Sequence, residues 1–479
     1  MSKQPTYTDK TATGGDTNTR GLEYQKAYML ANLPHWLAHS AFSAATHELV
    51  GDIEVKYFDS AVGELIDFYQ VKNYTLTPTQ LRTIAEDFQS KVDEGPFRHF
   101  YIVCNGLSAE ASPIGSALDR IRRQAPADAA AFYPTDTPLD VNTTTDFISQ
   151  VVKTGGTEDL GRFLLTKVSI EFRHSLNEIN AEAMFKHMMQ KYYPEVEDLP
   201  SSALTSLYQR VRALVEDRRG QPITRSQLIH VITGAVALPL PSFDKLGIHT
   251  LHDVTPYRGN AISLPWAAFF GGRERSYPDS EQWNDLLLAQ LARVQAWLQA
   301  SDTTKTLLLT GQRRLSANIA LGWAFPAVGE FTLVHEHRGS QWRTDQYQTD
   351  ATPKYDFAPT FQLGENETII VSIGIGHDIA AEVRQAAETL GLSRAAHLDL
   401  HTPLALTCAD QVNLAVQNVK VHLKRALHES NAQTIHLFLA TPATFALFLG
   451  HRLNGVTSVQ CYERRAPTEY VPTCRLKAQ

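Results

Sequence analysis

The hydrophobic pattern of the first hundred residues switches between the periods of helices and strands. Apolar residues recur with helical spacing over 22–33, and Pro34 is expected to end that helix. Over 52–57 apolar and charged residues alternate, which predicts a strand with one buried face. Further strands are expected over 65–72 and over 100–104, and the latter ends at an Asn-Gly turn signal.

A helix with a complete start signal lies between the second and third of these strands. Thr77 is a suitable N-cap, Pro78 fits the first helical position, and Gln80 completes a capping box. The expected order over 20–105 is therefore helix, strand, strand, helix, strand. The polar residues 1–19 before it are expected to form a loose arm.

The region over 107–235 is predicted to be mostly helical, and it contains an arginine-rich stretch. One interpretation is a set of side chains that track a phosphate backbone. Because Glu216 and Asp217 lie among the arginines, we favour a solvated helix face. Helix breaks are expected near Pro126, Pro134 and Pro138, and the arginines are Arg210, Arg212, Arg218, Arg219 and Arg225.

The C-terminal half contains a repeat of strand, helix and strand. The first copy covers 306–335 and the second covers 434–462, with a constant offset of 434 − 306 = 128 that also aligns Gly322 with Gly450. An amphipathic helix precedes each copy. Alternating strands and helices are typical of parallel α/β sheets, so we expect two similar α/β units with a ligand site between them.

The length and one proline-rich segment define the expected domains. A chain of 479 residues has room for about three domains of roughly 150 residues. The segment 238–241, with two prolines, is typical of a boundary. We therefore expect one domain over 1–235, with a core over 20–105, and a second over 236–479 that contains both repeat copies.

Composition narrows the class of protein. Hydrophobic residues make up 43% and charged residues 20%, as in ordinary globular chains. The 44 basic and 51 acidic residues give a net charge of −7, which argues against a uniformly basic surface but allows a local DNA-binding patch. The four cysteines form no CxxC pair, and no apolar stretch suggests a signal peptide or a membrane span. We expect a cytoplasmic protein.

One predicted hairpin carries the residue types of metal-dependent phosphodiester cleavage. That chemistry needs hard oxygen ligands for Mg²⁺ and a cation near the attacked phosphate. Gln70 and Lys72 lie two apart on a strand and therefore project from one face, and Asp52 on the preceding strand can meet them. The alternatives to Asp52 are Glu54, Glu64 and Asp67, of which Asp67 is expected to point away from Gln70.

This set resembles the QxK variant of the PD-(D/E)xK nuclease family, in which Gln replaces the second acid. The predicted order of elements resembles the α+β core of that family. The resemblance implies that Asp52 and Gln70 bind Mg²⁺ and that Lys72 positions the attacking water or stabilises the phosphorane charge. The helix with Glu23 and Gln25 resembles the first helix of the family, and either side chain is a candidate to reach the metal.

Three strand-to-helix loops in the C-terminal half are candidates to bind phosphate groups. Backbone N–H groups at a helix N-terminus favour anions, and small residues allow close approach. The first loop, 311–316, adds the charges of Arg313 and Arg314. The second covers 374–378, and the third, 440–443, is the repeat partner of the first.

The segments 307–325, 340–342, 368–380 and 435–462 together resemble the SAVED domain. That family consists of two fused Rossmann-like CARF halves and binds cyclic oligonucleotides that a partner nucleotidyltransferase makes during phage infection. The resemblance covers about 240–479. The ligand contacts that we expect are Gly311, Gln312, Arg313, Arg314, Ser316, Trp342, Gly374, Gly376, His377, Thr441 and Pro442.

A QxK nuclease fused to a SAVED domain is similar to the effector endonucleases of CBASS anti-phage systems. The resemblance implies that a cyclic oligonucleotide, a cyclic trinucleotide in particular, promotes self-association and thereby switches on cutting of double-stranded DNA with little sequence preference. We expect no membrane to take part. Two other functions remain: a sensor whose nuclease-like domain only binds DNA or a partner, and a cyclic-nucleotide hydrolase.

Overall fold

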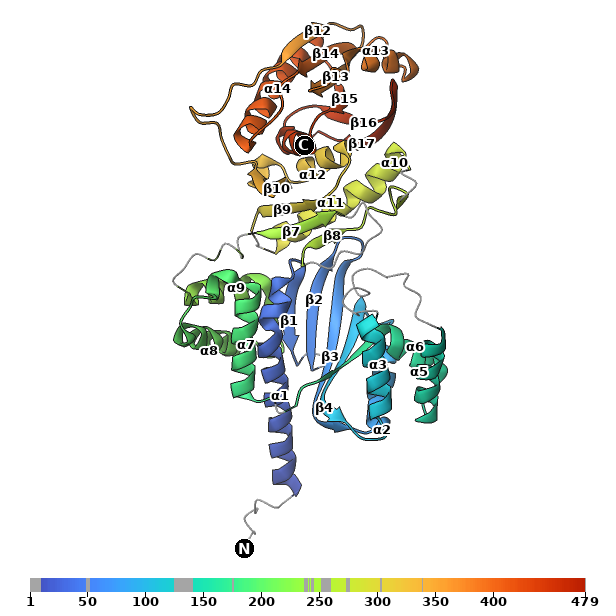
Figure 1. The fold of residues 1–479 in the computed structure, drawn as a ribbon, viewed down its shortest axis with the longest axis vertical. Helices are drawn as coiled ribbons and strands as arrows, with labels where there is room; N and C mark the ends of the chain where they lie inside the picture. Colours follow the sequence, from blue (N-terminus) through green and yellow to red (C-terminus); the bar gives the residue numbers. More distant parts are fainter. Residues whose placement is uncertain are drawn as a thin grey trace. The chain divides into compact units, whose positions relative to one another are not determined.

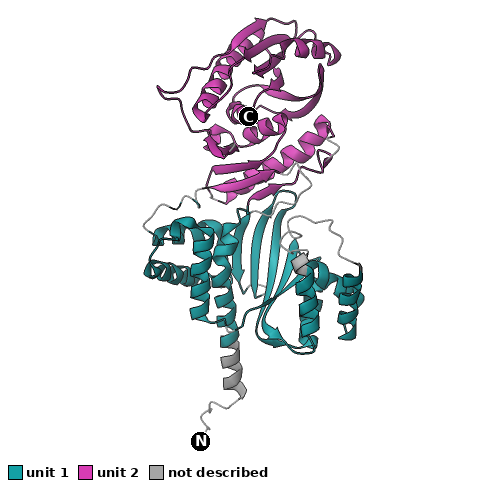
Figure 2. Ribbon diagram, in the orientation of Figure 1, with its two compact units in different colours: residues 1–243, 256–260 teal, residues 244–255, 261–479 magenta. Residues whose placement is uncertain are grey.

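The computed structural model divides the chain into two compact units (Figure 2). Unit 1 contains 1–243 and 256–260, and unit 2 contains 244–255 and 261–479. Residues 236–243, expected in the second domain, therefore fall in unit 1. The structure describes residues 10–48, 52–124, 141–174, 176–236, 240, 242, 245–250, 260–272, 276–301, 304–337 and 339–478, so the three proline breaks and most of the segment 238–241 lie outside it.

Unit 1 is built on one six-stranded sheet (Figure 1). Its central strands follow from the alternating pattern of the sequence, but each is longer than the pattern predicted, and the Asn-Gly pair expected to end one strand lies inside it. The first strand was not predicted. The strands are β1 (Phe42–His47), β2 (Ile53–Asp59), β3 (Gly63–Leu76), β4 (Phe97–Leu107), β5 (Val168–Phe172) and β6 (Pro222–Thr224).

The strand order is β5-β4-β3-β2-β1-β6, with β3, β4 and β5 parallel and the neighbours β6-β1-β2-β3 antiparallel. Helices cover both faces, and each face has its own hydrophobic cluster. The helices of one face are α1 (Lys10–Ala38), α7 (Glu178–Tyr192), α8 (Ser201–Asp217) and α9 (Arg225–Ala235), and those of the other are α2 (Pro78–Lys91), α3 (Ser112–Gln124), α5 (Val141–Lys153) and α6 (Glu158–Lys167).

Helix α1 corrects two predictions. It begins at Lys10 rather than near residue 22, and it continues through Pro34 to Ala38. A proline inside a helix removes one hydrogen bond and costs about 3 kcal/mol. Leu33 and Trp36, on both sides of Pro34, are almost fully buried, so packing against the sheet offsets that cost.

The start of helix α2 confirms the predicted capping box. The Gln80 backbone N–H donates to the Thr77 hydroxyl, and the Gln80 side chain accepts from the Thr77 backbone N–H at 3.0 Å. The described parts of 107–235, which are 107–124, 141–174 and 176–235, are mostly helical, as predicted, apart from β5 and β6.

Unit 2 contains two sheets, one in each half of the repeat (Figure 1). Their central strands are parallel, as expected, whereas β11, β12 and β17 join their sheets antiparallel. The first sheet contains β7 (Leu246–Thr250), β8 (Ile262–Leu264), β9 (Thr306–Gly311), β10 (Thr332–His337) and β11 (Ser340–Arg343); the second contains β12 (Ala358–Gln362), β13 (Thr368–Ile375), β14 (Ala396–Thr402), β15 (Thr434–Ala440), β16 (Ser458–Ala466) and β17 (Glu469–Leu476).

The helices of unit 2 follow the predicted repeat. The helix of the first copy, α12, and that of the second, α15, begin and end 128 residues apart. The two helices cross where Gly322 faces Gly450, and each glycine lies against the backbone of the other helix. The helices are α10 (Ser280–Gln282), a π-helical turn (Trp283–Leu288), α11 (Ala289–Ala300), α12 (Leu315–Ala324), α13 (Ala380–Thr389), α14 (Ala409–Ser430) and α15 (Ala443–Arg452).

Candidate functional site

In unit 1 the hairpin of β2 and β3 brings Asp52 and Lys72 together. One carboxylate oxygen of Asp52 accepts hydrogen bonds from the Val71 backbone N–H at 2.6 Å and from Lys72 Nζ at 3.3 Å. Partial burial raises the pKa of Asp52, although Lys72 and the Val71 N–H oppose that shift. Both contacts use the same oxygen, so among the described residues the second oxygen of Asp52 has no donor and is available to another ligand.

The other acids weighed against Asp52 have different environments. Asp67 forms a buried ion pair with Arg98, whose Nε donates to Oδ1 at 2.8 Å. Glu64 pairs with Lys56 at 3.0 Å on a more exposed part of the hairpin. Glu54 is buried, with 6% exposure, and it pairs in register with Phe68. Asp52 is therefore the acid that contacts Lys72.

Gln70 and Gln25 are the two amide side chains expected near Asp52. Gln70 is half-buried within β3, and its side chain forms no hydrogen bond with any residue that the structure describes. Gln25, on α1, is buried, and within the described part of the chain its Oε1 has no hydrogen-bond partner. Glu23 is largely exposed and pairs with Lys26 at 2.8 Å. A buried acceptor that lacks a donor favours Gln25 over Glu23 as the residue of α1 that meets a ligand.

His47, at the end of β1, is a neighbour of this set that the sequence did not indicate. It is buried, with 5% exposure, and its Nε2 has no hydrogen-bond partner among the described residues. Burial is the main cause that lowers its pKa, and the charges of Glu48, Asp52, Arg219 and Lys26 also act on it. The sequence did not predict β1, and it is the register of β1 with β2 that brings His47 near Asp52. His47 could therefore not be identified from the sequence pattern.

Among the described residues, acidic and imidazole side chains can supply only some of the ligands of a metal site. Within the described ranges, no group of three His, Cys, Asp or Glu side chains is arranged to hold a metal ion. Further ligands must then be amide oxygens, water or substrate phosphate, all of which Mg²⁺ accepts. The unpartnered Oε1 of Gln25 and the free oxygen of Asp52 fit that donor set.

The side chains of the arginine-rich stretch form hydrogen bonds and ion pairs with other residues of unit 1. Arg212 pairs with Glu178 and Glu216, and Arg219 pairs with Glu48. The other three do likewise: Arg210 donates to the Gly234 carbonyl, Arg218 donates to Gln221, and buried Arg225 donates to the carbonyls of Leu37 and His39. Arg210 and Arg212 lie on the solvent side of α8, as the favoured interpretation of a solvated helix face predicts, whereas Arg225 is buried at the start of α9, so that interpretation is wrong for it.

In unit 2 the first predicted ligand loop lies between β9 and α12. Gly311 has a positive φ of 87°, and a side chain there would overlap the Thr250 carbonyl, so the position requires glycine. Gln312 is exposed. Arg313 is turned inward: it donates to the Thr310 carbonyl at 2.7 Å and to Asn318 Oδ1 at 2.9 Å. Burial lowers the pKa of Arg313 to about 10.

The N-terminus of α12 is already in contact with a carboxylate of its own chain. Glu463 on β16 accepts a hydrogen bond from the Ser316 backbone N–H at 2.7 Å, and burial raises the pKa of Glu463. The Ser316 hydroxyl is buried and accepts from Thr473 at 2.8 Å. Arg314 lies over the rings of Phe270 and Tyr277.

The second predicted ligand loop, between β13 and α13, is exposed. Gly374 lies inside β13, paired in register with Ala440, so the turn begins later than predicted. Gly376 has a positive φ of 78°, and His377 is 62% exposed, 3.5 Å from Glu382.

Thr441 and Pro442 precede α15, the repeat partner of α12, and Pro442 is its exposed N-cap residue. The Thr441 hydroxyl is buried without a hydrogen-bond partner in the part of the chain that the structure describes. An unpaired hydroxyl at a helix N-terminus makes this loop the better candidate of the two repeat partners for an anionic ligand.

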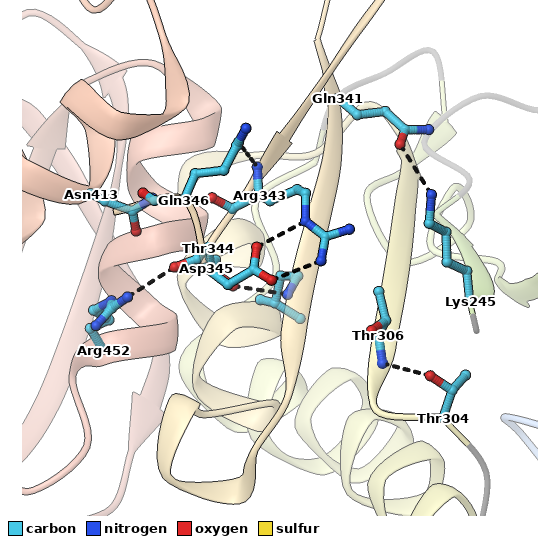
Figure 3. A network of polar contacts seen from close by, with 11 residues as sticks. Lys245, Thr304, Thr306, Gln341, Arg343, Thr344, Asp345, Gln346, Asn413 and Arg452 are labelled. Carbon is cyan, nitrogen blue, oxygen red and sulfur yellow. Dashed lines mark hydrogen bonds and ion pairs between the residues drawn. The ribbon is translucent and has the colours of Figure 1, made fainter. Parts of the chain in front are cut away.

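Trp342 lies on β11, beside a turn that ties the two halves of unit 2 together. Asn413 of α14 donates to the carbonyls of Arg343 (3.1 Å) and Gln346 (2.7 Å), and Arg452 of α15 donates to the Thr344 carbonyl at 2.9 Å. The bidentate Arg343–Asp345 ion pair lies beside these contacts and is partly exposed (Figure 3). Trp342 is half-buried at the edge of the first sheet, opposite His335 in register.

Two further predictions can be compared with the described residues. All four cysteines are free, as expected from their spacing. Within the described ranges, no helix has the length and apolar character needed to cross a membrane.

Comparisons with known proteins identify the class of unit 2 and of the whole chain. Residues 290–476 match the family model described as SAVED, the SMODS-associated and fused to various effectors sensor domain. CD-NTase-associated protein 4 of Acinetobacter sp. (strain ATCC 27244 / 9458) is 30% identical over 477 residues, 98% of both chains.

Solved structures agree with this match over nearly the whole chain. The Acinetobacter baumannii Cap4 SAVED/CARF-domain containing receptor with the cyclic trinucleotide 2′3′3′-cAAA superposes with a TM-score of 0.82 at 27% identity, over 95% of this chain and 98% of that one. The same receptor with 3′3′3′-cAAA also gives 0.82 at 27% identity, over 95% and 99%.

The fold and these matches define a mixed α/β protein whose C-terminal part is a SAVED sensor domain. The predicted resemblance to the SAVED domain is confirmed. The chain belongs to the CD-NTase-associated protein 4 family.

Proposed function

We propose that this chain is an endonuclease of CBASS anti-phage defence that a cyclic oligonucleotide switches on. Unit 2 binds the messenger, and unit 1 then cuts double-stranded DNA with Mg²⁺ and little sequence preference. The contact between Asp52 and Lys72 is the observation that carries this proposal, because it joins an acid and a cation at the end of the hairpin that also holds Gln70.

The residues of unit 1 have separate roles in the proposal. Asp52 offers its free oxygen to the metal ion, while the Val71 N–H holds the other oxygen. Gln70 and Gln25 add amide oxygens that have no protein donor among the described residues. Lys72 orients the water or stabilises charge on the phosphate. Bound Mg²⁺ polarises the phosphate and makes a bound water more acidic.

A cyclic trinucleotide is the messenger that we propose for unit 2. Its support is the similarity to the Acinetobacter baumannii receptor with 2′3′3′-cAAA and with 3′3′3′-cAAA. The candidate contacts are the loops before α12 and α15 and the turn at Gly376. The messenger must bind the active state more tightly than the resting one, and we propose that this active state is self-associated.

The first test is plasmid cleavage by the full chain with Mg²⁺, with and without each cyclic trinucleotide. We expect cleavage that requires one of the two nucleotides. Lys72→Ala should reduce the rate by about 100-fold or more, because a charge-stabilising group at the phosphate is lost. Agarose gels of supercoiled plasmid measure the rate.

Lys56→Ala is the matched control. Lys56 belongs to the same hairpin, but it pairs with Glu64 and not with Asp52. It should cut DNA at close to the wild-type rate. If nucleotide binds and neither wild type nor Lys56→Ala cuts, unit 1 is not a nuclease and the sensor that only binds DNA or a partner is favoured. Consumption of the nucleotide without DNA cleavage would favour a cyclic-nucleotide hydrolase.

A further inference from the structure

The end of β1 brings a buried histidine to the proposed metal centre. His47 pairs in register with Ile53, the residue after Asp52. The Glu48 backbone N–H donates to the Asp52 carbonyl at 3.0 Å, so the main chains of the two segments meet there. His47 and Asp52 therefore lie at the joined ends of β1 and β2.

The His47 ring nitrogen lacks the partner that a buried polar atom normally has. Its Nε2 is excluded from solvent and has no hydrogen-bond partner in the described residues. A buried polar atom without a partner is unfavourable, so unpaired atoms of this kind often mark a site for a ligand. Gln25 Oε1 is unpaired in the same way.

Both unpaired atoms belong to the side of the sheet that α1 covers. His47 pairs in register with Ile53, which belongs to the same hydrophobic cluster as Tyr24 and Ala27 of α1, and Gln25 lies between these two residues of α1. The main chain around His47 is also held in place, because the Gly220 N–H donates to the His47 carbonyl at 2.9 Å and Arg219 pairs with Glu48. A fixed backbone with an unpaired ring nitrogen is suited to ligand binding.

We propose that His47 Nε2 is a direct ligand of the metal ion that Asp52 binds. This inference rests on the metal-dependent nuclease proposed above and deepens it. The donor set then contains one carboxylate, one imidazole and amide oxygens. Imidazole is a better ligand for transition metals than for Mg²⁺, so the centre should bind Mn²⁺ more tightly than Mg²⁺.

Pulsed electron paramagnetic resonance of the full chain with Mn²⁺ tests this ligand without any measurement of cleavage. Wild-type protein should show electron spin echo modulation from a coordinated ¹⁴N nucleus. Labelling all histidines with ¹⁵N should replace that signal by the ¹⁵N pattern. His47→Gln should lose the nitrogen signal, and its Mn²⁺ affinity should fall by about tenfold or more, while its Mg²⁺ affinity changes less.

Two variants serve as controls. His99→Gln removes another buried histidine of the same sheet, whose Nδ1 lies 3.2 Å from the Lys167 carbonyl, and it should keep the nitrogen signal. Asp52→Asn should lose Mn²⁺ binding. ¹⁵N labelling shows that a histidine coordinates the ion, and His47→Asn is the second variant that assigns the ligand if His47→Gln does not fold.

The outcomes separate this inference from the proposed function. Bound Mn²⁺ without nitrogen modulation in wild type, or modulation that survives in folded His47→Gln, overturns the role of His47 and leaves the Asp52 centre intact. If wild type binds no Mn²⁺, both the metal centre and the inference fail.

Discussion

At the scale of single residues, two acids of one hairpin have different environments and therefore different expected roles. Asp67 and Asp52 are both partly or fully withdrawn from solvent beside β3. Asp67 is enclosed with Arg98, whose guanidinium also lies 4.4 Å from the centre of the Tyr57 ring. Asp52 keeps one oxygen that has no donor in the part of the chain that the structure describes. The first arrangement stabilises the fold, whereas the second leaves an acid available for a ligand.

Removal of the Asp67 charge should therefore destabilise unit 1. Asp67→Asn leaves the buried Arg98 guanidinium without its counterion, and we expect the free energy of unfolding to fall by about 3–5 kcal/mol. Chemical denaturation followed by circular dichroism measures this change. Glu64→Gln breaks the more exposed pair with Lys56 and should cost about 1 kcal/mol or less. Equal losses of unfolding free energy in the two variants would contradict the conclusion that the buried Asp67–Arg98 pair stabilises unit 1 more than the exposed pair does.

At the scale of elements, the crossing of α12 and α15 depends on two glycines. A side chain on Gly322 would overlap the Leu447 carbonyl, and one on Gly450 would overlap the Ile319 carbonyl. The close approach of these helices joins the two halves of the repeat directly. The repeat offset aligned these glycines in the sequence, but only the structure reveals that they face each other.

Gly322→Ala should weaken the packing of unit 2. We expect a loss of about 1–3 kcal/mol or more, because the backbones of both helices must separate to admit a methyl group. Differential scanning calorimetry measures the shift. Gly234→Ala in α9 is the control, since nothing lies within 4 Å of the added carbon, and it should be neutral or stabilise by about 0.4–1 kcal/mol. A stable Gly322→Ala would show that the helices separate at little cost.

At the scale of the whole molecule, the chain consists of two compact units with separate cores. Such a protein can unfold in two steps, one for each unit. If only unit 2 binds the messenger, ligand should stabilise only the transition of that unit. The effect of the ligand then reports which unit carries the sensor.

We expect a cyclic trinucleotide to raise one of two melting temperatures of the full chain. At a concentration 100 times its Kd, it should add about 2.7 kcal/mol to the unit that binds it. Differential scanning calorimetry resolves the transitions, and Lys72→Ala should show the same shift because Lys72 lies in unit 1. An equal shift of both transitions would contradict a sensor confined to unit 2.

The sequence by itself determined the features that depend on local pattern. The capping box before α2 and both copies of the 128-residue repeat were predicted, since side-chain periodicity and cap residues act over a few positions. The sequence also separated Asp67 from Gln70 by strand alternation. The resemblance to the SAVED domain was correct because it used several segments together.

Only the tertiary structure decided features that depend on distant neighbours. Pro34 stays inside α1 because packing outweighs its local penalty, and Arg313 turns inward because Thr310 and Asn318 accept its hydrogen bonds. Likewise, His47 becomes a candidate ligand only because β1 pairs with β2 beside Asp52. Burial and long-range hydrogen bonds set these outcomes, and neither is encoded in the spacing of residues along the chain.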